Sequence, residues 1–131
     1  MATVELRVSE PASDAALNEL FTSAWVGHSE RAFGPVLSKS LLYVCAYANE
    51  RLVGFVNVAT DGGQHAFILD TTVHREHRRA GIGRALVRKA VDEAARAGAA
   101  WVHVDYEPEL NGFYEACGFR PCCAGVLRVG A

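Results

Sequence analysis

The chain has 131 residues, of which 50% are hydrophobic and 21% are charged, and its formal net charge is −2. This is the composition of a soluble globular protein, and the length predicts one domain over residues 1–131. The near-neutral charge argues against a nucleic-acid partner, no apolar run approaches the ~20 residues of a membrane span, and the alternating, early-acidic start is not a secretory signal.

The first half of the chain predicts one strand, one helix and a three-stranded meander. Apolar residues alternate over 3–8, which indicates a strand, and Ser13 or Asp14 can cap a helix with one apolar face that extends to Trp25. A break over 27–35 leaves room for a second short helix. Further strands are expected over 41–48, 52–58 and 64–73, with turns at Asn49-Glu50 and Asp61-Gly62-Gly63.

The second half predicts two helices and further strands. The clearest helix covers 81–97, where apolar residues repeat every four positions and Gly98 ends the run. A strand over 101–106, a short helix over 109–117 and a last strand or two within 119–129 follow. Three meander strands before a single β-α-β crossover predict an α/β fold of the α+β kind. Its central sheet is mixed and mostly antiparallel, with helices on both faces, unlike a doubly wound dinucleotide fold.

A basic loop, residues 75–81, leads from a predicted strand into the clearest helix. Six basic residues and one acid lie between Arg75 and Lys89, in a chain that is net negative. Gly81 and Gly83 lack Cβ atoms, so a pyrophosphate can approach the backbone at the helix start. The unpaired N–H groups there carry roughly half a positive charge. The junction therefore predicts a site for a phosphate-bearing cofactor.

The order of motifs resembles the GNAT superfamily of acyl-CoA-dependent N-acyltransferases. Arg78-x-x-Gly81-x-Gly83 opens the helix, a strand follows, and Phe113-Tyr114-Glu115-Ala116-Cys117-Gly118-Phe119 comes at the expected distance. The chain departs from the family pattern at Arg75, Ala80 and Glu107, where proline, a basic residue and asparagine are common. The resemblance implies a GNAT-like fold, acetyl-CoA as co-substrate and cofactor contacts from Thr72, Val73, Arg78, Arg79, Ala80, Gly81, Ile82, Gly83, Arg84, Asn111 and Tyr114.

Two residues are candidates for proton transfer. The resemblance implies that Tyr114 donates a proton to the departing thiolate, although a half-buried tyrosine that anchors the last helix would show the same pattern. Asp70 lies between apolar neighbours on a strand expected to be buried, where a carboxylate needs a partner or a role. It is either a structural acid or the general base, acting directly or through water. Acceptor-pocket residues are expected at Trp25, His28 and Glu30.

These observations predict an acetyl-CoA-dependent N-acetyltransferase that transfers the acetyl group directly to a primary amine. The acceptor is a small molecule or a peptide, and a homodimer is left open. Two alternatives use the same loop: a non-catalytic acyl-CoA-binding or regulatory module, and a nucleotide-phosphate binder. The four cysteines have neither metal-ligand spacing nor the density of a disulfide scaffold. We therefore expect reduced thiols, no metal, no membrane partner and a cytoplasmic location.

Overall fold

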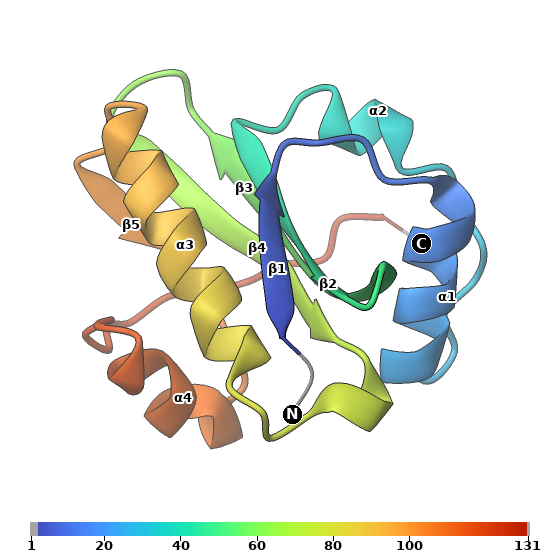
Figure 1. The fold of residues 1–131 in the computed structure, drawn as a ribbon. Helices are drawn as coiled ribbons and strands as arrows, with labels where there is room; N and C mark the ends of the chain where they lie inside the picture. Colours follow the sequence, from blue (N-terminus) through green and yellow to red (C-terminus); the bar gives the residue numbers. More distant parts are fainter. Residues whose placement is uncertain (1–2, 131) are drawn as a thin grey trace.

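The computed structural model describes residues 3–130 and contains one five-stranded sheet in the order β1-β2-β3-β4-β5 (Figure 1). Neighbouring strands are antiparallel from β1 to β4, and β5 pairs with β4 in parallel. This is the mixed, mostly antiparallel sheet that the sequence predicts. The elements are β1 (Val4–Val8), α1 (Asp14–Ala24), α2 (Gly34–Leu37), β2 (Leu42–Ala48), β3 (Arg51–Thr60), β4 (His65–Val73), η1 (Arg75–His77), α3 (Ile82–Arg96), β5 (Trp101–His103), η2 (Pro108–Leu110) and α4 (Asn111–Ala116).

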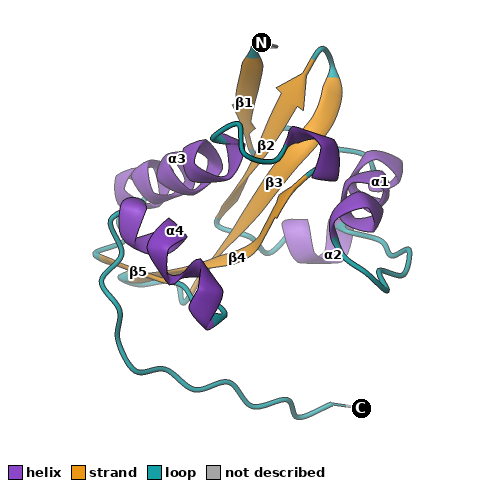
Figure 2. Ribbon diagram, turned by 90° about the horizontal axis from the view of Figure 1, so that it is seen from below, coloured by secondary structure: helices purple, strands orange, loops and turns teal. Residues whose placement is uncertain are grey.

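Helices cover both faces of the sheet, with α1 and α3 on opposite sides (Figure 2). The Ser13 side chain caps α1 by accepting a hydrogen bond from the Ala16 N–H at 3.1 Å, as the sequence suggests. The apolar stripe of α1 then packs on one face of β2 and β3, including Phe55, which is 2% exposed. On the other face the stripe of α3 buries Ile82, Leu86, Ala90 and Ala94. The two cores fix both helices relative to the end of β4.

Gly54 lets β3 approach α3 closely. A Cβ atom at this position would lie 2.8 Å from Leu86 Cδ1, 3.1 Å from Ile82 Cγ2 and 3.2 Å from Ala46 Cβ. These distances leave no room for a methyl group in a buried layer. The contact holds the first two turns of α3 against the middle of the sheet.

A β-bulge interrupts β4 next to its end. Asn57 of β3 pairs with Leu69 and Phe55 pairs with Thr72, so two residues of β4 oppose one residue of β3. Before the bulge Ala66 and Ile68 belong to the core under α3, whereas Thr72 lies opposite Phe55 in the core under α1. Even-numbered residues of β4 therefore face α3 before the bulge and α1 after it, just before the basic loop begins.

The strands β4 and β5 pair only at their starts. The register joins His65 to Trp101, Ala66 to Val102 and Phe67 to His103, where β5 ends, whereas β4 continues to Val73. The strand predicted over 101–106 is therefore shorter than expected, because residues 104–107 leave the sheet without regular secondary structure. Past Phe67 the outer edge of β4 is open within the part of the chain that the structure describes.

The prediction of a last strand or two within 119–129 is wrong. Residues 119–130 have no regular secondary structure, and all of residues 120–130 are exposed. Figure 2 shows this segment leaving the body of the molecule. The apolar residues of this segment are compatible with a strand, but in this structure it pairs with no neighbouring strand. Among residues 3–130 no helix is long and apolar enough to cross a membrane.

Candidate functional site

Two adjoining cavities lie where β4 and β5 separate. Their volumes are about 290 Å³ and 200 Å³. Both are lined by Val73 from the end of β4, Arg78 from the basic loop, Gly83 from α3 and Phe113 from α4. A strand end, a glycine-containing helix start and an aromatic side chain thus converge on one opening.

The first cavity is built around the N-terminus of α3. Gly81 precedes the helix with a φ of +79°, a left-handed conformation that glycine adopts without strain. The first intrahelical bond here runs from the Ala85 N–H to the Gly81 carbonyl at 3.1 Å. The N–H groups of Ile82, Gly83 and Arg84 therefore have no intrahelical acceptor. Together with the Arg78 and Arg79 side chains, this end of the cavity attracts anions.

The basic loop is tied to the end of α1. Arg78 Nη2 donates to the Ala24 carbonyl at 3.2 Å, and the Arg75 N–H donates to Ser23 Oγ at 3.4 Å. Because the apolar face of α1 is buried in the core, these contacts place the loop beside the opening. Arg79 has a φ of +63°, so the loop turns sharply two residues before Gly81.

The second cavity combines the C-terminal end of α1 with the bulge of β4. Trp25 Nε1 donates to Thr72 Oγ1 at 3.0 Å, and Thr72 Oγ1 donates to the Asp70 carbonyl at 2.8 Å. This chain of bonds fixes the indole as one wall of the cavity. Thr71 Oγ1 is buried and has no hydrogen-bond partner among the described residues. A lone polar oxygen in the cavity wall offers a contact to a polar ligand group.

Tyr114 lines the second cavity and is only 6% exposed. Its ring stacks on Tyr106, with centroids 4.8 Å apart, and meets Phe119 edge-on at 5.8 Å. Burial raises the pKa of the Tyr114 phenol, and the neighbouring Thr71 side chain counteracts part of this rise. The phenol is therefore held in its protonated form at neutral pH, as a proton donor must be.

The backbone N–H of Val73 faces the opening between the strands. The His74 N–H donates to the Val53 carbonyl at 2.8 Å, so His74 and Val53 form a hydrogen-bonded pair of the antiparallel ladder. Gly54 and Val73 are the next pair, and such pairs alternate. The N–H and carbonyl of Val73 therefore point away from β3, toward the side from which β5 has diverged.

The structure brings most of the sequence-predicted site residues together. Those that line one or both cavities are Trp25, Thr72, Val73, Arg78, Arg79, Gly81, Ile82, Gly83, Arg84 and Tyr114. Ala80 is exposed in the loop between them without lining either cavity. Among the described residues, no group of three or more histidine, cysteine or acidic side chains is placed to hold a metal ion.

The expectation that Asp70 lies on a buried part of its strand is wrong. Asp70 is exposed rather than buried, it lines neither cavity, and it lies in the bulge with a φ of +57°. The bulge turns the residue out of the alternating pattern on which the expectation rested. Its carboxylate therefore needs no structural partner, and its role as a base stays a prediction.

Three other residues predicted to contact ligands, His28, Glu30 and Asn111, lie outside the cavities. His28 Nε2 is 2.8 Å from Asn18 Oδ1, and the same Asn18 side chain bonds to the backbone of Asp14 and Arg31, so His28 helps to hold the loop after α1. Glu30 is exposed in that loop.

Asn111, at the start of α4, is engaged within its own helix end. It accepts a hydrogen bond from the Tyr106 hydroxyl at 2.9 Å and donates to Glu115. It lines neither cavity.

Sequence reasoning missed five residues that line the cavities: Ala24, Thr71, His77, Leu110 and Phe113. Phe113 lines both cavities, and a Cβ added at Gly83 would lie 3.4 Å from its ring. Its position directly before Tyr114 was the available signal, because neighbouring residues on a helix project about 100° apart and can border one concave surface. Thr71 gave no signal, since its inward position depends on the bulge.

A family model, the acetyltransferase (GNAT) family, matches residues 13–119. The chain belongs to this family. The uncharacterized N-acetyltransferase ycf52 of Pyropia yezoensis is 29% identical over 72 residues, which are 55% of the chain and 41% of that protein. The chain thus spans less than half the length of this curated relative.

Solved structures show the same GNAT fold. A GNAT family acetyltransferase from Streptococcus pneumoniae TIGR4 has a TM-score of 0.82 at 24% identity, with 98% of each chain covered. The aminoglycoside N-acetyltransferase AAC(6')-Iy, solved in complex with CoA, has a TM-score of 0.78 at 16% identity. That match covers 99% of the chain and 96% of the other protein.

Proposed function

We propose that this GNAT protein is an acetyl-CoA-dependent N-acetyltransferase that transfers the acetyl group directly to a primary amine. The observation that carries the proposal is the junction of the two cavities. The anion-attracting start of α3 borders one cavity, and the protonated phenol of Tyr114 borders the other. Such a pair of sites suits a phosphate-bearing thioester whose departing thiolate needs a proton donor.

The residues around the first cavity fit the phosphates of CoA. The N–H groups of Ile82, Gly83 and Arg84 point into a site that also contains the Arg78 and Arg79 side chains. Gly81 carries no Cβ, so the pyrophosphate meets backbone rather than a side chain. The CoA complex of a structural relative supports the choice of ligand.

Bound acetyl-CoA supplies an acyl thioester whose carbonyl carbon is open to attack by a neutral amine. The Val73 N–H, which faces away from β3, donates to the carbonyl oxygen and stabilises the charge that develops on it. As the new C–N bond forms and the C–S bond breaks, the Tyr114 hydroxyl gives its proton to the leaving sulfur. Trp25 and Thr72 form the wall against which the reacting groups are held.

The amine must lose a proton, since alkyl amines with a pKa near 10 are mostly protonated at neutral pH. We assign this step to Asp70, acting through a water molecule because its carboxylate lines neither cavity. His28 and Glu30 lie further along the loop after α1 and are the next candidates. The expected partners are a small-molecule or peptide amine, and the expected compartment is the cytoplasm.

Thiol release from acetyl-CoA in the presence of a panel of amines tests the proposal. Release that depends on both the enzyme and one class of amine supports it. Binding of CoA without release for any amine in the panel would favour the non-catalytic acyl-CoA-binding module. Competition by ATP as strong as that by CoA would favour the nucleotide-phosphate binder.

A further inference from the structure

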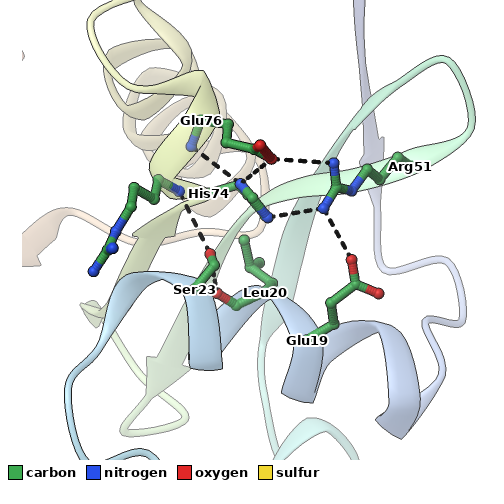
Figure 3. Close-up of polar contacts among 7 residues, drawn as sticks. Glu19, Leu20, Ser23, Arg51, His74 and Glu76 are labelled. Atoms are coloured by element: carbon green, nitrogen blue, oxygen red, sulfur yellow. Dashed lines mark hydrogen bonds and ion pairs between the residues drawn. The ribbon is translucent and has the colours of Figure 1, made fainter.

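A buried imidazole joins the end of β4 to the basic loop (Figure 3). It lines neither cavity. His74 follows β4 directly and is 5% exposed. Its N–H donates to the Val53 carbonyl and its carbonyl accepts from the His77 N–H, both at 2.8 Å. The residue therefore links the sheet to the turn η1 that begins the loop.

Both ring nitrogens of His74 face N–H donors. Nδ1 accepts from the Glu76 N–H at 3.1 Å, which caps η1, and Nε2 lies 3.0 Å from Arg51 Nη2. The Arg51 guanidinium also binds Glu19 Oε1 at 3.1 Å and Glu76 Oε2 at 3.4 Å (Figure 3). A neutral imidazole offers one bare nitrogen as acceptor, and an imidazolium offers none. The neutral ring therefore accepts from one of the two donors, and the imidazolium accepts from neither.

The charges around the ring act in opposite directions on the pKa of His74, and the causes that lower it prevail. Burial lowers the pKa of His74, and the Arg51 guanidinium on β3 lowers it further. The carboxylate of Glu76, 3.8 Å from Nδ1, and that of Glu19 on α1 raise the pKa, while His77, with ring centroids 5.8 Å apart, lowers it. The net result is a pKa below the ordinary value, so that the ring is neutral at pH 7.

Given the CoA site proposed above, we infer that neutral His74 is a positioning residue for the basic loop, and that its protonation releases the loop and weakens cofactor binding in mildly acidic solution. Whereas His77 lines the first cavity, His74 itself lines neither. The residue acts through the loop that carries Arg78 and Gly81.

The weakness of the other contacts explains why the loop depends on this ring. The bonds from the Arg75 N–H to Ser23 Oγ and from Arg78 Nη2 to Ala24 measure 3.4 and 3.2 Å. A protonated ring cannot accept from the Glu76 N–H, so η1 loses its cap, and the new charge faces Arg51. Because the folded-state pKa is depressed, the cap is intact above the ordinary histidine pKa of about 6.5. It is lost as the pH falls through the folded-state value.

Calorimetric titrations between about pH 7.5 and about pH 5 test the inference through the histidine range. The ligand is 3′-dephospho-CoA, because the 3′-phosphate of CoA has its own pKa of about 6. For the wild type, the dissociation constant should rise about tenfold for each pH unit below the His74 pKa. In His74→Asn the amide oxygen can cap η1 without titrating, so the loss of affinity in mildly acidic solution should disappear.

A second variant should move the midpoint of the pH dependence of cofactor affinity in a known direction. Arg51→Gln removes the guanidinium that depresses the His74 pKa, so the loss of affinity should begin at a higher pH than in the wild type. A wild-type pH dependence retained in His74→Asn would overturn the inference, as would an unchanged midpoint in Arg51→Gln.

An NMR titration without ligand separates this inference from the proposed function. The backbone resonances of Glu76 and Gly81 should follow the titration of the His74 ring, and resonances that do not respond would contradict the positioning role. A wild-type protein that binds neither CoA nor 3′-dephospho-CoA at about pH 7.5 would instead contradict the proposed function. The two failures therefore give different results.

Discussion

Tyr114 combines a buried ring with a hydroxyl at the wall of the second cavity. Tyr114→Phe keeps the stacking on Tyr106 and removes the proton donor. We expect the chemical step to slow by about 10²–10⁴ with little change in CoA affinity, measured by single-turnover kinetics and calorimetry. Because burial raises the phenol pKa, the Tyr114-dependent rate should be lost only as the pH rises beyond the ordinary value of about 10.

Tyr106→Phe is the matched control for this prediction. It removes a hydroxyl that bonds to Asn111 and keeps the ring against Tyr114. Its single-turnover rate should stay near that of the wild type. Equal rates in the wild type and Tyr114→Phe would leave Tyr114 with a packing role alone.

Asp70 is exposed in the bulge, so its substitution separates catalysis from stability. Asn tolerates a φ of +57°, and Asp70→Asn keeps the backbone while it removes the charge. We expect a lower kcat/KM, most severe at neutral pH and partly rescued at higher pH, where more of the amine is already neutral. The melting temperature should not change, because the carboxylate is solvated.

Asp92→Asn, on the exposed side of α3, controls for the loss of one negative charge. A pH–rate profile of Asp70→Asn that matches the Asp92→Asn profile would remove Asp70 from the mechanism. The proton would then leave through another group, for which His28 and Glu30 are the next residues to substitute.

At the level of elements, Gly54 marks a close contact between β3 and α3. Gly54→Ala places a methyl group 2.8 Å from Leu86 Cδ1, so we expect the free energy of unfolding to fall by about 1–3 kcal/mol in denaturant titrations. Gly112→Ala, in α4, meets nothing within 4 Å and should be neutral or stabilising by up to about 1 kcal/mol. A Gly54→Ala protein as stable as Gly112→Ala would contradict this prediction, because it would show that α3 can move away from β3 at little cost.

Most elements could be predicted from the sequence because each has a local signal. Ser13 marks the start of α1, Asn49-Glu50 turns with two positive φ angles, and Gly98 follows the end of α3. The predicted basic loop and helix start coincide with the first cavity. These features depend on residues close together in the chain, which is why sequence reasoning reached them.

The features that sequence reasoning missed depend on distant partners. The bulge that exposes Asp70 and buries Thr72 appears only in the register against β3. The apolar residues in 119–129 are compatible with a strand, yet a strand also needs a neighbour with which to pair, and no local pattern shows whether one is present. For the same reason the wall formed by Phe113 and Thr71 could not be predicted.

For the whole molecule, residues 121–130 contribute little to the folded body. All are exposed, and Val126, Leu127 and Val129 are 80%, 82% and 92% exposed. A chain that ends at Arg120 should keep its free energy of unfolding within about 0.5 kcal/mol, as exposed segments usually do. A larger loss in denaturant titrations would show that this segment packs on the sheet in solution.

The proposed function depends on the start of α3 as a binding site for the phosphates of CoA. Calorimetric titration of CoA into Gly81→Asp and Gly81→Asn tests this directly. Both side chains tolerate the φ of +79° and have nearly the same size, so the pair differs by one negative charge. Gly81→Asp should bind CoA at least about tenfold more weakly than Gly81→Asn, a difference of about 1.4 kcal/mol. Equal affinities in the two folded variants would contradict the assignment of this loop as the cofactor site.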